Sequence, residues 1–309
     1  LDVIIPVYKP GKEFVKLIEK LYEQEYIINR IIIMNTEEKY FELFTYGTDF
    51  FEKYPKVELY HISKREFDHG RTRHWGVKKS TAPFFMVMTQ DAEPVDALLT
   101  KQLMAAHEQP GVAVSYARQL PREDCNEAEC FTRSFNYPDT SRIKTKADIS
   151  ELGIKTYFCS NVCALYNREI YDKLGGFIKK TIFNEDMIYA AKAVKAGYGI
   201  AYCASAEVIH SHNYTGVEQF HRNFDLGVSQ ADNPDIFEDV PSESEGIKMV
   251  IKTITYLKEI GQIHKVPGVI YISACKYIGY LLGKNYKKLP RAFVMKCTMN
   301  PEYWKFTTV

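Results

Sequence analysis

The residues Asp2-Val3-Ile4-Ile5-Pro6-Val7, followed by the turn Tyr8-Lys9-Pro10-Gly11, decide the fold. Continuous apolar, β-branched runs of this kind are typical of strands that are buried on both faces of a parallel sheet. Similar runs recur farther along the chain, at 30–34, 57–62 and 84–88. Segments with helical spacing of apolar residues lie between these runs, at 12–24, 41–54 and 70–80. The alternation predicts an α/β fold with a doubly wound, mostly parallel sheet flanked by helices.

The rest of the chain alternates less regularly. We expect helices at 95–108, 169–174 and 184–196, and strands at 112–119, 157–166, 200–203 and 207–210. The polar stretch 121–150 is interpreted as a long functional loop. An acidic connector containing Pro and Ser covers 232–246, and helical spacing resumes at 247–283. These patterns predict a main domain over 1–232, made of halves 1–95 and 96–232, and a C-terminal helical segment over 247–309.

Composition excludes several classes of protein. The chain has 309 residues, 46% of them apolar, and a net charge of +1. A nucleic-acid-binding protein would carry a clear basic excess, so no nucleic-acid partner is expected. The seven cysteines are irregularly spaced and form no Cys-x-x-Cys pair, which favours reduced thiols in a cytoplasmic protein over a zinc site. The first residues resemble a strand rather than a signal peptide, and no run of 18 apolar residues predicts a membrane span.

Polar residues follow three of the predicted strands. In doubly wound sheets, ligands bind at the carboxyl ends of the strands. This rule selects Pro6–Tyr8, Asn35–Glu37 and Gln90–Glu93. Asp91 could hold Mg²⁺ or Mn²⁺ against a diphosphate, or it could cap the helix that follows.

Three further groups could carry chemistry. Asp186, at the start of a helix, could be a general base or an ordinary first-turn carboxylate. In His210-Ser211-His212, alternate residues of a strand face opposite ways, so one histidine lines the cleft or both are structural. Asp68 and Arg71 lie where a helix begins, which suits an anion site or solvated charge.

Several sequence motifs, taken in their order along the chain, resemble those of glycosyltransferase family 2. They are Val3–Lys9, FDHGRTR at 67–73, MTQDAEP at 88–94 and Asn184–Asp186. FDHGRTR, TQDAEP and QFHRNFDLG at 219–227 are similar, more narrowly, to the bacterial rhamnosyltransferases of that family. Those enzymes build rhamnose-containing cell-wall and O-antigen polysaccharides from dTDP-L-rhamnose. The resemblance covers roughly residues 2–230. It implies a GT-A fold with a nucleotide-binding first half and an acceptor-binding, catalytic second half.

The resemblance also implies a role for each residue by its position. Nucleotide and donor binding falls on Pro6, Val7, Tyr8, Asn35, Glu37, Asp68, Arg71, Gln90 and Arg222. The turn at 35–37 lacks the family's usual Asp, so Asn35 or Glu37 is expected to replace it. Thr89-Gln90-Asp91 stands in place of the family's Asp-x-Asp motif, and only the last Asp is kept. Asp91, His210 and His212 are therefore the implied ligands of Mg²⁺ or Mn²⁺, and Asp186 is the implied catalytic base.

The implied reaction is an inverting sugar transfer. Asp186 deprotonates a hydroxyl of a lipid-linked or polysaccharide acceptor, which attacks L-rhamnose as dTDP departs. Alternatives are a family 2 transferase with a UDP-sugar donor and an inactive sugar-nucleotide-binding module, the latter because the first motif Asp is missing. A nucleotidyltransferase would need a Gly-rich basic loop after the first strand, and residues 8–12 do not match one.

The C-terminal segment mixes apolar stretches with lysines. Such a surface could dock on the anionic inner face of the cell membrane, where lipid-linked acceptors lie. An apolar helical stripe could equally pack on the main domain or on a second subunit of a homodimer.

Overall fold

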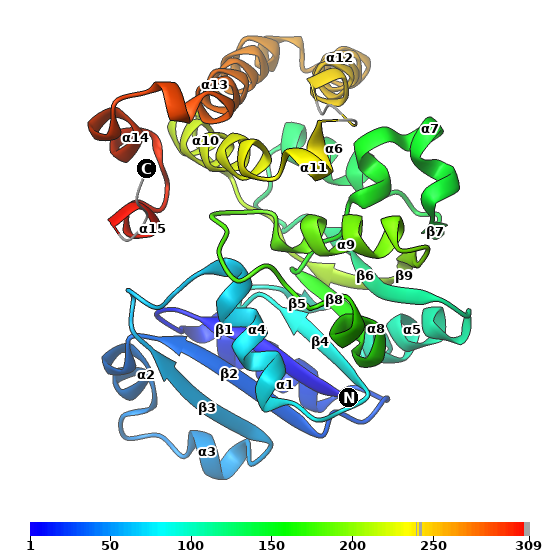
Figure 1. Ribbon diagram of the computed structural model, residues 1–309, viewed down its shortest axis with the longest axis vertical. Coiled ribbons are helices and arrows are strands. Elements are labelled where there is room, and N and C mark those ends of the chain that lie inside the picture. The colour runs from blue at the N-terminus through cyan, green and yellow to red at the C-terminus, as the bar shows by residue number, and fades with distance from the viewer. Residues whose placement is uncertain (239, 241–242, 306–309) are drawn as a thin grey trace. The chain divides into compact units, whose positions relative to one another are not determined.

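The computed structural model describes residues 1–238, 240 and 243–305 (Figure 1). Contacts divide these residues into two compact units. The first unit holds 1–120, 137–180 and 185–210. The second holds 121–136, 181–184 and the described residues from 211 onward. The predicted boundary at residue 232 falls at the end of a helix of the second unit, Gly216–Asp232.

The first unit is built on a nine-stranded sheet with the order β3-β2-β1-β4-β8-β6-β9-β5, and β7 pairs with β9. The strands are β1 (Asp2–Val7), β2 (Arg30–Thr36), β3 (Val57–Ile62), β4 (Phe84–Met88), β5 (Glu93–Pro94), β6 (Val112–Leu120), β7 (Arg142–Lys144), β8 (Cys163–Asn167) and β9 (Gly199–Ile209). β1 to β4 run parallel, as their continuous apolar runs predict. β8 is antiparallel to both of its neighbours, so the whole sheet is mixed.

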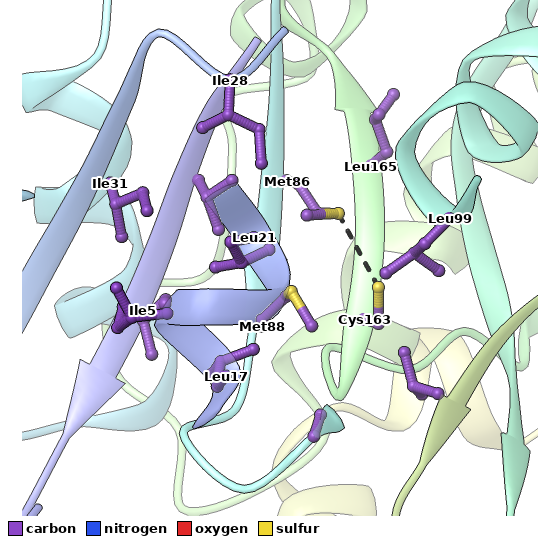
Figure 2. Close-up of a cluster of buried hydrophobic side chains, with 14 of the residues drawn as sticks. Ile5, Leu17, Leu21, Ile28, Ile31, Met86, Met88, Leu99, Cys163 and Leu165 are labelled. Atoms are coloured by element: carbon purple, nitrogen blue, oxygen red, sulfur yellow. Dashed lines mark hydrogen bonds between the residues drawn. The ribbon is translucent and has the colours of Figure 1, made fainter. Parts of the chain in front are cut away.

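Helices flank this sheet in the first unit (Figure 1). They are α1 (Lys12–Tyr22), α2 (Glu38–Thr45), α3 (Phe50–Lys53), α4 (His69–Lys79), α5 (Leu99–Ala105), α7 (Ile149–Leu152), α8 (Arg168–Lys173) and α9 (Glu185–Lys195). Figure 2 shows Leu17 and Leu21 of α1 facing the sheet beside Ile5 and Met88. The predicted α/β architecture is confirmed.

The second unit is helical. It contains α6 (Glu127–Asn136), α10 (Gly216–Asp232), α11 (Pro234–Phe237), α12 (Glu243–Glu259), α13 (Val266–Lys284), α14 (Arg291–Cys297) and α15 (Pro301–Lys305). α10 and α13 lie side by side (Figure 1). A Cβ atom on Gly279 would overlap the carbonyl oxygen of Phe220, and one on Gly283 would overlap that of Phe224. The two helices therefore meet backbone to backbone, which only glycine permits.

One expectation is corrected. Residues 121–150 are not one irregular loop, because α6 occupies Glu127–Asn136. The segment Ile263–Lys284, which includes α13, is long and apolar enough by composition to cross a membrane. Pro267, Gly268 and Lys276 lie within this segment, so it holds no uninterrupted run of 18 apolar residues.

Candidate active site

The carboxyl ends of β1, β2 and β4 meet at one edge of the sheet. Val7 pairs with Asn35 in the parallel register of β1 and β2. The Gln90 side chain joins the end of β4 to the end of β1: Tyr8 N donates to Gln90 Oε1 at 2.8 Å, and Gln90 Nε2 donates to Tyr8 O at 3.0 Å. A carboxylate could only accept hydrogen bonds, so an amide at the middle position of the motif suits this double contact.

The turn after β2 is strained and largely self-bonded. Asn35 is fully buried, and its Nδ2 contacts Glu37 O at 3.2 Å and His61 Nδ1 at 3.0 Å. Among the described residues, Asn35 Oδ1 has no hydrogen-bond partner. Glu37 has φ of +64°, a conformation that is costly for a residue other than glycine. Such strain occurs most often at ligand sites, which agrees with the position of this turn.

Asp91 and His210 face each other because β5 pairs with β9. Glu93 lies opposite Ile209 in this antiparallel ladder, so the turn before β5 meets the end of β9. Asp91 Oδ2 lies 3.5 Å from His210 Nε2, and the His210 side chain is 8% exposed. A carboxylate oxygen and an imidazole nitrogen thus converge at the carboxyl edge of the sheet.

Gln119, near the end of β6, orients this histidine. Gln119 Oε1 lies 3.1 Å from His210 Nδ1, and an amide oxygen can only accept, so Nδ1 carries the proton. In the neutral ring this leaves a lone pair on Nε2, the atom that faces Asp91. Gln119 Nε2 bonds Tyr137 Oη at 2.5 Å and Ser160 Oγ at 2.9 Å, which fixes the amide. A histidine held in this way by an outer hydrogen bond is the usual arrangement around a metal ion, so the donor set fits a divalent cation.

Asp186 lies in the first turn of α9 and is held by two backbone N–H groups. Asn161 N donates to Oδ2 at 3.0 Å, and Met187 N donates to Oδ1 at 2.8 Å. Burial, and then the negative charge of Glu185, raise the pKa of Asp186 to about 7 against the effect of these hydrogen bonds. A carboxyl group with a pKa near neutrality is suited to accept a proton during catalysis.

The pKa of Glu185, the residue before Asp186, is shifted in the opposite direction. Burial would raise its pKa, but the Arg73 guanidinium, His69 and the Asn161 amide outweigh burial and hold the pKa below its usual value. Arg73 Nη1 lies 3.2 Å from Glu185 Oε1, and both side chains are at most 8% exposed. Asn161 Nδ2 also donates to Glu185 Oε1, at 3.0 Å. Glu185 therefore stays ionised and fixes α9 against α4.

The Asp91–His210 pair and Asp186 are connected by a short chain of contacts. Gln119, which bonds His210, also bonds Ser160, and the next residue, Asn161, bonds Asp186. The structure therefore brings both centres to the same end of the sheet, although 95 positions separate Asp91 from Asp186 in the sequence.

Asp68 and Arg71 shape the start of α4. Asp68 Oδ1 accepts from Gly70 N at 2.9 Å and Arg71 N at 3.0 Å, so the carboxylate is an N-cap. Arg71 donates through Nε and Nη2 to Glu66 O, at 3.1 and 2.5 Å, and stacks over Trp75. Both side chains thus stabilise the loop that leads into the helix.

His212 and Arg222 belong to the second unit. The His212 ring lies 5.0 Å from the Tyr214 ring, and the Arg222 guanidinium lies 4.6 Å from the Phe183 ring centroid and 5.8 Å from that of Tyr214. The structure thus places Arg222 among aromatic rings.

Sequence reasoning missed four residues of this network: Arg73, Gln119, Asn161 and Glu185. Arg73 and Glu185 lie within the motifs at 67–73 and 184–186. Their closeness in sequence to Arg71 and Asp186 could therefore have marked them as site residues. Gln119 and Asn161 carry no such signal, because their importance comes only from the side chains that they contact.

Comparison with known proteins identifies the family. The family profile "Glycosyl transferase family 2" matches residues 2–175. The O-antigen chain rhamnosyltransferase RfbN of Salmonella typhimurium is 36% identical over 98% of this chain and 96% of its own length. The O-antigen chain rhamnosyltransferase WbaN of Salmonella anatum is 40% identical over 79% of this chain and 78% of its own.

Solved structures support the fold. The mannosyltransferase PcManGT of Pyrobaculum calidifontis, in complex with GDP-Man and Mn²⁺, aligns over 98% of this chain and 84% of its own, with a TM-score of 0.57 at 14% identity. TarS of S. aureus, in complex with UDP-GlcNAc, aligns over 93% of this chain and 91% of its own, with a TM-score of 0.53 at 12% identity. The likenesses show the GT-A fold, and the profile with the two relatives shows that the chain belongs to glycosyltransferase family 2.

Proposed function

We propose that this glycosyltransferase moves L-rhamnose from dTDP-β-L-rhamnose to a lipid-linked or polysaccharide acceptor, with inversion at the anomeric carbon. The two relatives bear the name O-antigen chain rhamnosyltransferase, and one of them is similar over nearly the whole chain. The observation that carries the proposal is the contact network from the Asp91–His210 pair to Asp186. It supplies one centre for a diphosphate and one for a base at the same end of the sheet.

In the proposed reaction Asp186 is the general base. Its ionised carboxylate takes the proton of the acceptor hydroxyl while the hydroxyl oxygen bonds to the anomeric carbon of rhamnose. The bond from that carbon to the diphosphate oxygen breaks, and dTDP leaves with the electron pair. A single displacement turns the β-linked donor into an α-linked product. The raised pKa of Asp186 supports this role. It makes the carboxylate a stronger base, and a group with a pKa of about 7 is still partly ionised at neutral pH.

Asp91 and His210 are the proposed ligands of a divalent cation, and His212, two residues farther along, is the proposed third. A cation held there would neutralise charge on the departing diphosphate. Carboxylates suit both Mg²⁺ and Mn²⁺, whereas imidazole favours transition metals, so this ligand set favours Mn²⁺.

The ends of β1 and β2 are the proposed nucleotide site. Pro6, Val7 and Tyr8 would line the nucleotide, and the Tyr8 ring stacks edge-on with Tyr40 at 5.4 Å. Asn35 or Glu37 would contact the base or ribose, and Asn35 Oδ1 is the buried acceptor at that turn. Asp68, Arg71 and Gln90 would act there chiefly by fixing the surrounding loops, since the side-chain hydrogen bonds described above go to backbone atoms. Arg222 is the proposed cation for donor phosphate or acceptor.

A donor panel tests the proposal. The full chain is incubated with Mn²⁺ and dTDP-β-L-rhamnose, UDP-glucose, UDP-N-acetylglucosamine or GDP-mannose, and calorimetry records binding while released nucleotide is measured with and without acceptor. The proposal predicts binding and release for dTDP-rhamnose at least about tenfold above the other donors. Preference for a UDP-sugar would overturn the rhamnose assignment. Binding with no release under any condition would indicate an inactive sugar-nucleotide-binding module.

The proposed location is the cytoplasm, at the inner face of the membrane. All seven cysteines are free thiols, which agrees with a reducing compartment. Nucleotide-sugar donor and lipid-linked acceptor would meet at that face.

A further inference from the structure

Residues 247–300 carry a charge that the rest of the chain does not share. They contain ten Lys or Arg residues and one acidic residue, Glu259, in a chain whose net charge is +1. The remaining residues therefore carry 38 acidic against 30 basic side chains. Positive charge so concentrated in one segment creates a local potential that favours an anionic partner.

α13 presents an apolar face to solvent within this basic segment. Ile263, Ile270, Tyr277, Ile278 and Leu281 form this apolar face, and their exposed fractions range from 39% to 61%. They recur at helical spacing along one side of the segment Ile263–Lys284. The single charged residue between 266 and 283, Lys276, is half-buried. A continuous exposed apolar stripe of this length usually marks an interaction surface.

The opposite side of α13 is fixed to the protein. Gly279 and Gly283 meet the α10 backbone at Phe220 and Phe224 without room for a side chain. Tyr280, between them, donates from its hydroxyl to Gln230 Oε1 of α10 at 2.8 Å. A helix held along one side in this manner can offer only its other side, so α13 is suited to lie on a surface rather than to cross a bilayer.

Lysines border the apolar face. Lys265 precedes α13, Lys284 is its last residue, and Lys287 and Lys288, both exposed, follow it. Lys265 also pairs with Glu127, and Lys287 with Asp232. α12 repeats the pattern, with Ile247 and Ile251 each 60% exposed and Lys248 and Lys252 next to them in sequence. Apolar side chains flanked by lysines are the pattern of helices that rest at the interface of an anionic bilayer.

We propose that α12 and α13 dock the enzyme on an anionic lipid surface, with the apolar face of α13 entering the headgroup region and the lysines contacting lipid phosphates. A second copy of the chain fits the apolar face of α13 less well than an anionic lipid surface does. Pairing two copies of this segment would bring the two positive charges together, and like charges across an interface oppose association. A lipid surface with negative headgroups satisfies both the apolar and the cationic residues.

Vesicle co-sedimentation of the full chain tests this. Vesicles of phosphatidylcholine alone are compared with vesicles that also contain phosphatidylglycerol, at low and high salt. The test variant is Ile270→Glu/Ile278→Glu, and the matched control is Ile27→Glu, which makes the same change at a residue that is 70% exposed in the first unit. Size-exclusion chromatography with light scattering gives the mass of each protein in solution. Release of nucleotide from the donor reports whether each variant is folded.

The wild type and Ile27→Glu are expected to pellet with anionic vesicles, to do so less at high salt, and to bind neutral vesicles weakly. The double variant should bind anionic vesicles at least about tenfold more weakly, because each substitution replaces an exposed apolar side chain that would enter the headgroup region with a carboxylate. Its solution mass and nucleotide release should be unchanged. Equal pelleting of the double variant would overturn the proposal. A wild-type dimer that the double variant dissociates would also overturn it and would assign the apolar face to a second copy.

Discussion

Replacing Asp186 with Asn removes the proposed base while keeping the shape of the side chain. Asn161 N and Met187 N donate to the two carboxylate oxygens, at 3.0 and 2.8 Å, and an amide can accept through only one of its two terminal atoms. A positioned general base contributes about 10²- to 10⁴-fold to rate, so kcat should fall at least about 100-fold. The affinity for the donor, measured by calorimetry, should change little, because the substitution leaves the Asp91–His210 pair intact.

The pH dependence of kcat in the wild type should report the ionisation of Asp186. Burial and the charge of Glu185 raise the pKa of Asp186 to about 7, and only the ionised form accepts a proton. Activity should therefore fall as pH drops through about 7. Glu185→Gln removes a negative charge that raises this pKa, so the acid limb should move to lower pH. The shift is read from kcat against pH for each variant.

Asp172→Asn is the matched control, because Asp172 is an exposed carboxylate on α8. It should retain wild-type kcat and pH dependence. Wild-type turnover in Asp186→Asn would refute the base assignment. An acid limb that does not move in Glu185→Gln, in a protein that still binds donor, would refute the assignment of that limb to Asp186.

Three further changes test the surroundings of the site and the second unit. Gln119→Leu should weaken Mn²⁺ binding, measured by calorimetry, by about tenfold or more, because loss of an outer hydrogen bond to a metal-binding histidine has that effect. Gln90→Asp loses the donor to Tyr8 O, and we expect the free energy of unfolding in urea to fall by about 1–3 kcal/mol. Gly283→Ala should lower the melting temperature, because its Cβ would overlap the Phe224 carbonyl of α10.

Each of these changes has a counterpart. Gln109 is exposed, so Gln109→Leu should leave Mn²⁺ affinity unchanged, and equal affinities for the two Leu variants would remove the orienting role of Gln119. Gly246 of α12 has open space around its Cβ position, so Gly246→Ala should be neutral or slightly stabilising. If Gly283→Ala behaves in the same way, the close helix contact is not present in solution. Gln90→Asp with wild-type stability would show that the contact to Tyr8 contributes nothing.

The sequence predicted the first half of the fold well because its signals are local. The strands Asp2–Val7, Val57–Ile62 and Phe84–Met88 match their predicted bounds, since each is a continuous apolar run. The helix expected over 41–54 is split into α2 and α3, and Gly47 between them has φ of +70°. The strands expected at 200–203 and 207–210 form one strand, β9, with a register irregularity opposite Ala117 and Arg118. Such an irregularity depends on the neighbouring strand, which local patterning does not describe.

The site was predictable only where a motif marks it. Asp91, Asp186 and His210 lie in recognisable strings, and the structure connects all three through contacts. The connecting residues Gln119 and Asn161 come from a strand and a loop with no distinctive pattern. Their role depends on tertiary contacts, as does the raised pKa of Asp186, and neither can be read from spacing.

The central claim is that one bound sugar diphosphate contacts both the Asp91–His210 pair and Asp186. A crystal structure of the Asp186→Asn variant with Mn²⁺ and dTDP-β-L-rhamnose tests this most directly. Mn²⁺ is expected between the diphosphate and the Asp91 and His210 side chains, with the anomeric carbon of the sugar facing residue 186. A donor bound with its diphosphate away from Asp91, or with its sugar remote from residue 186, would contradict it.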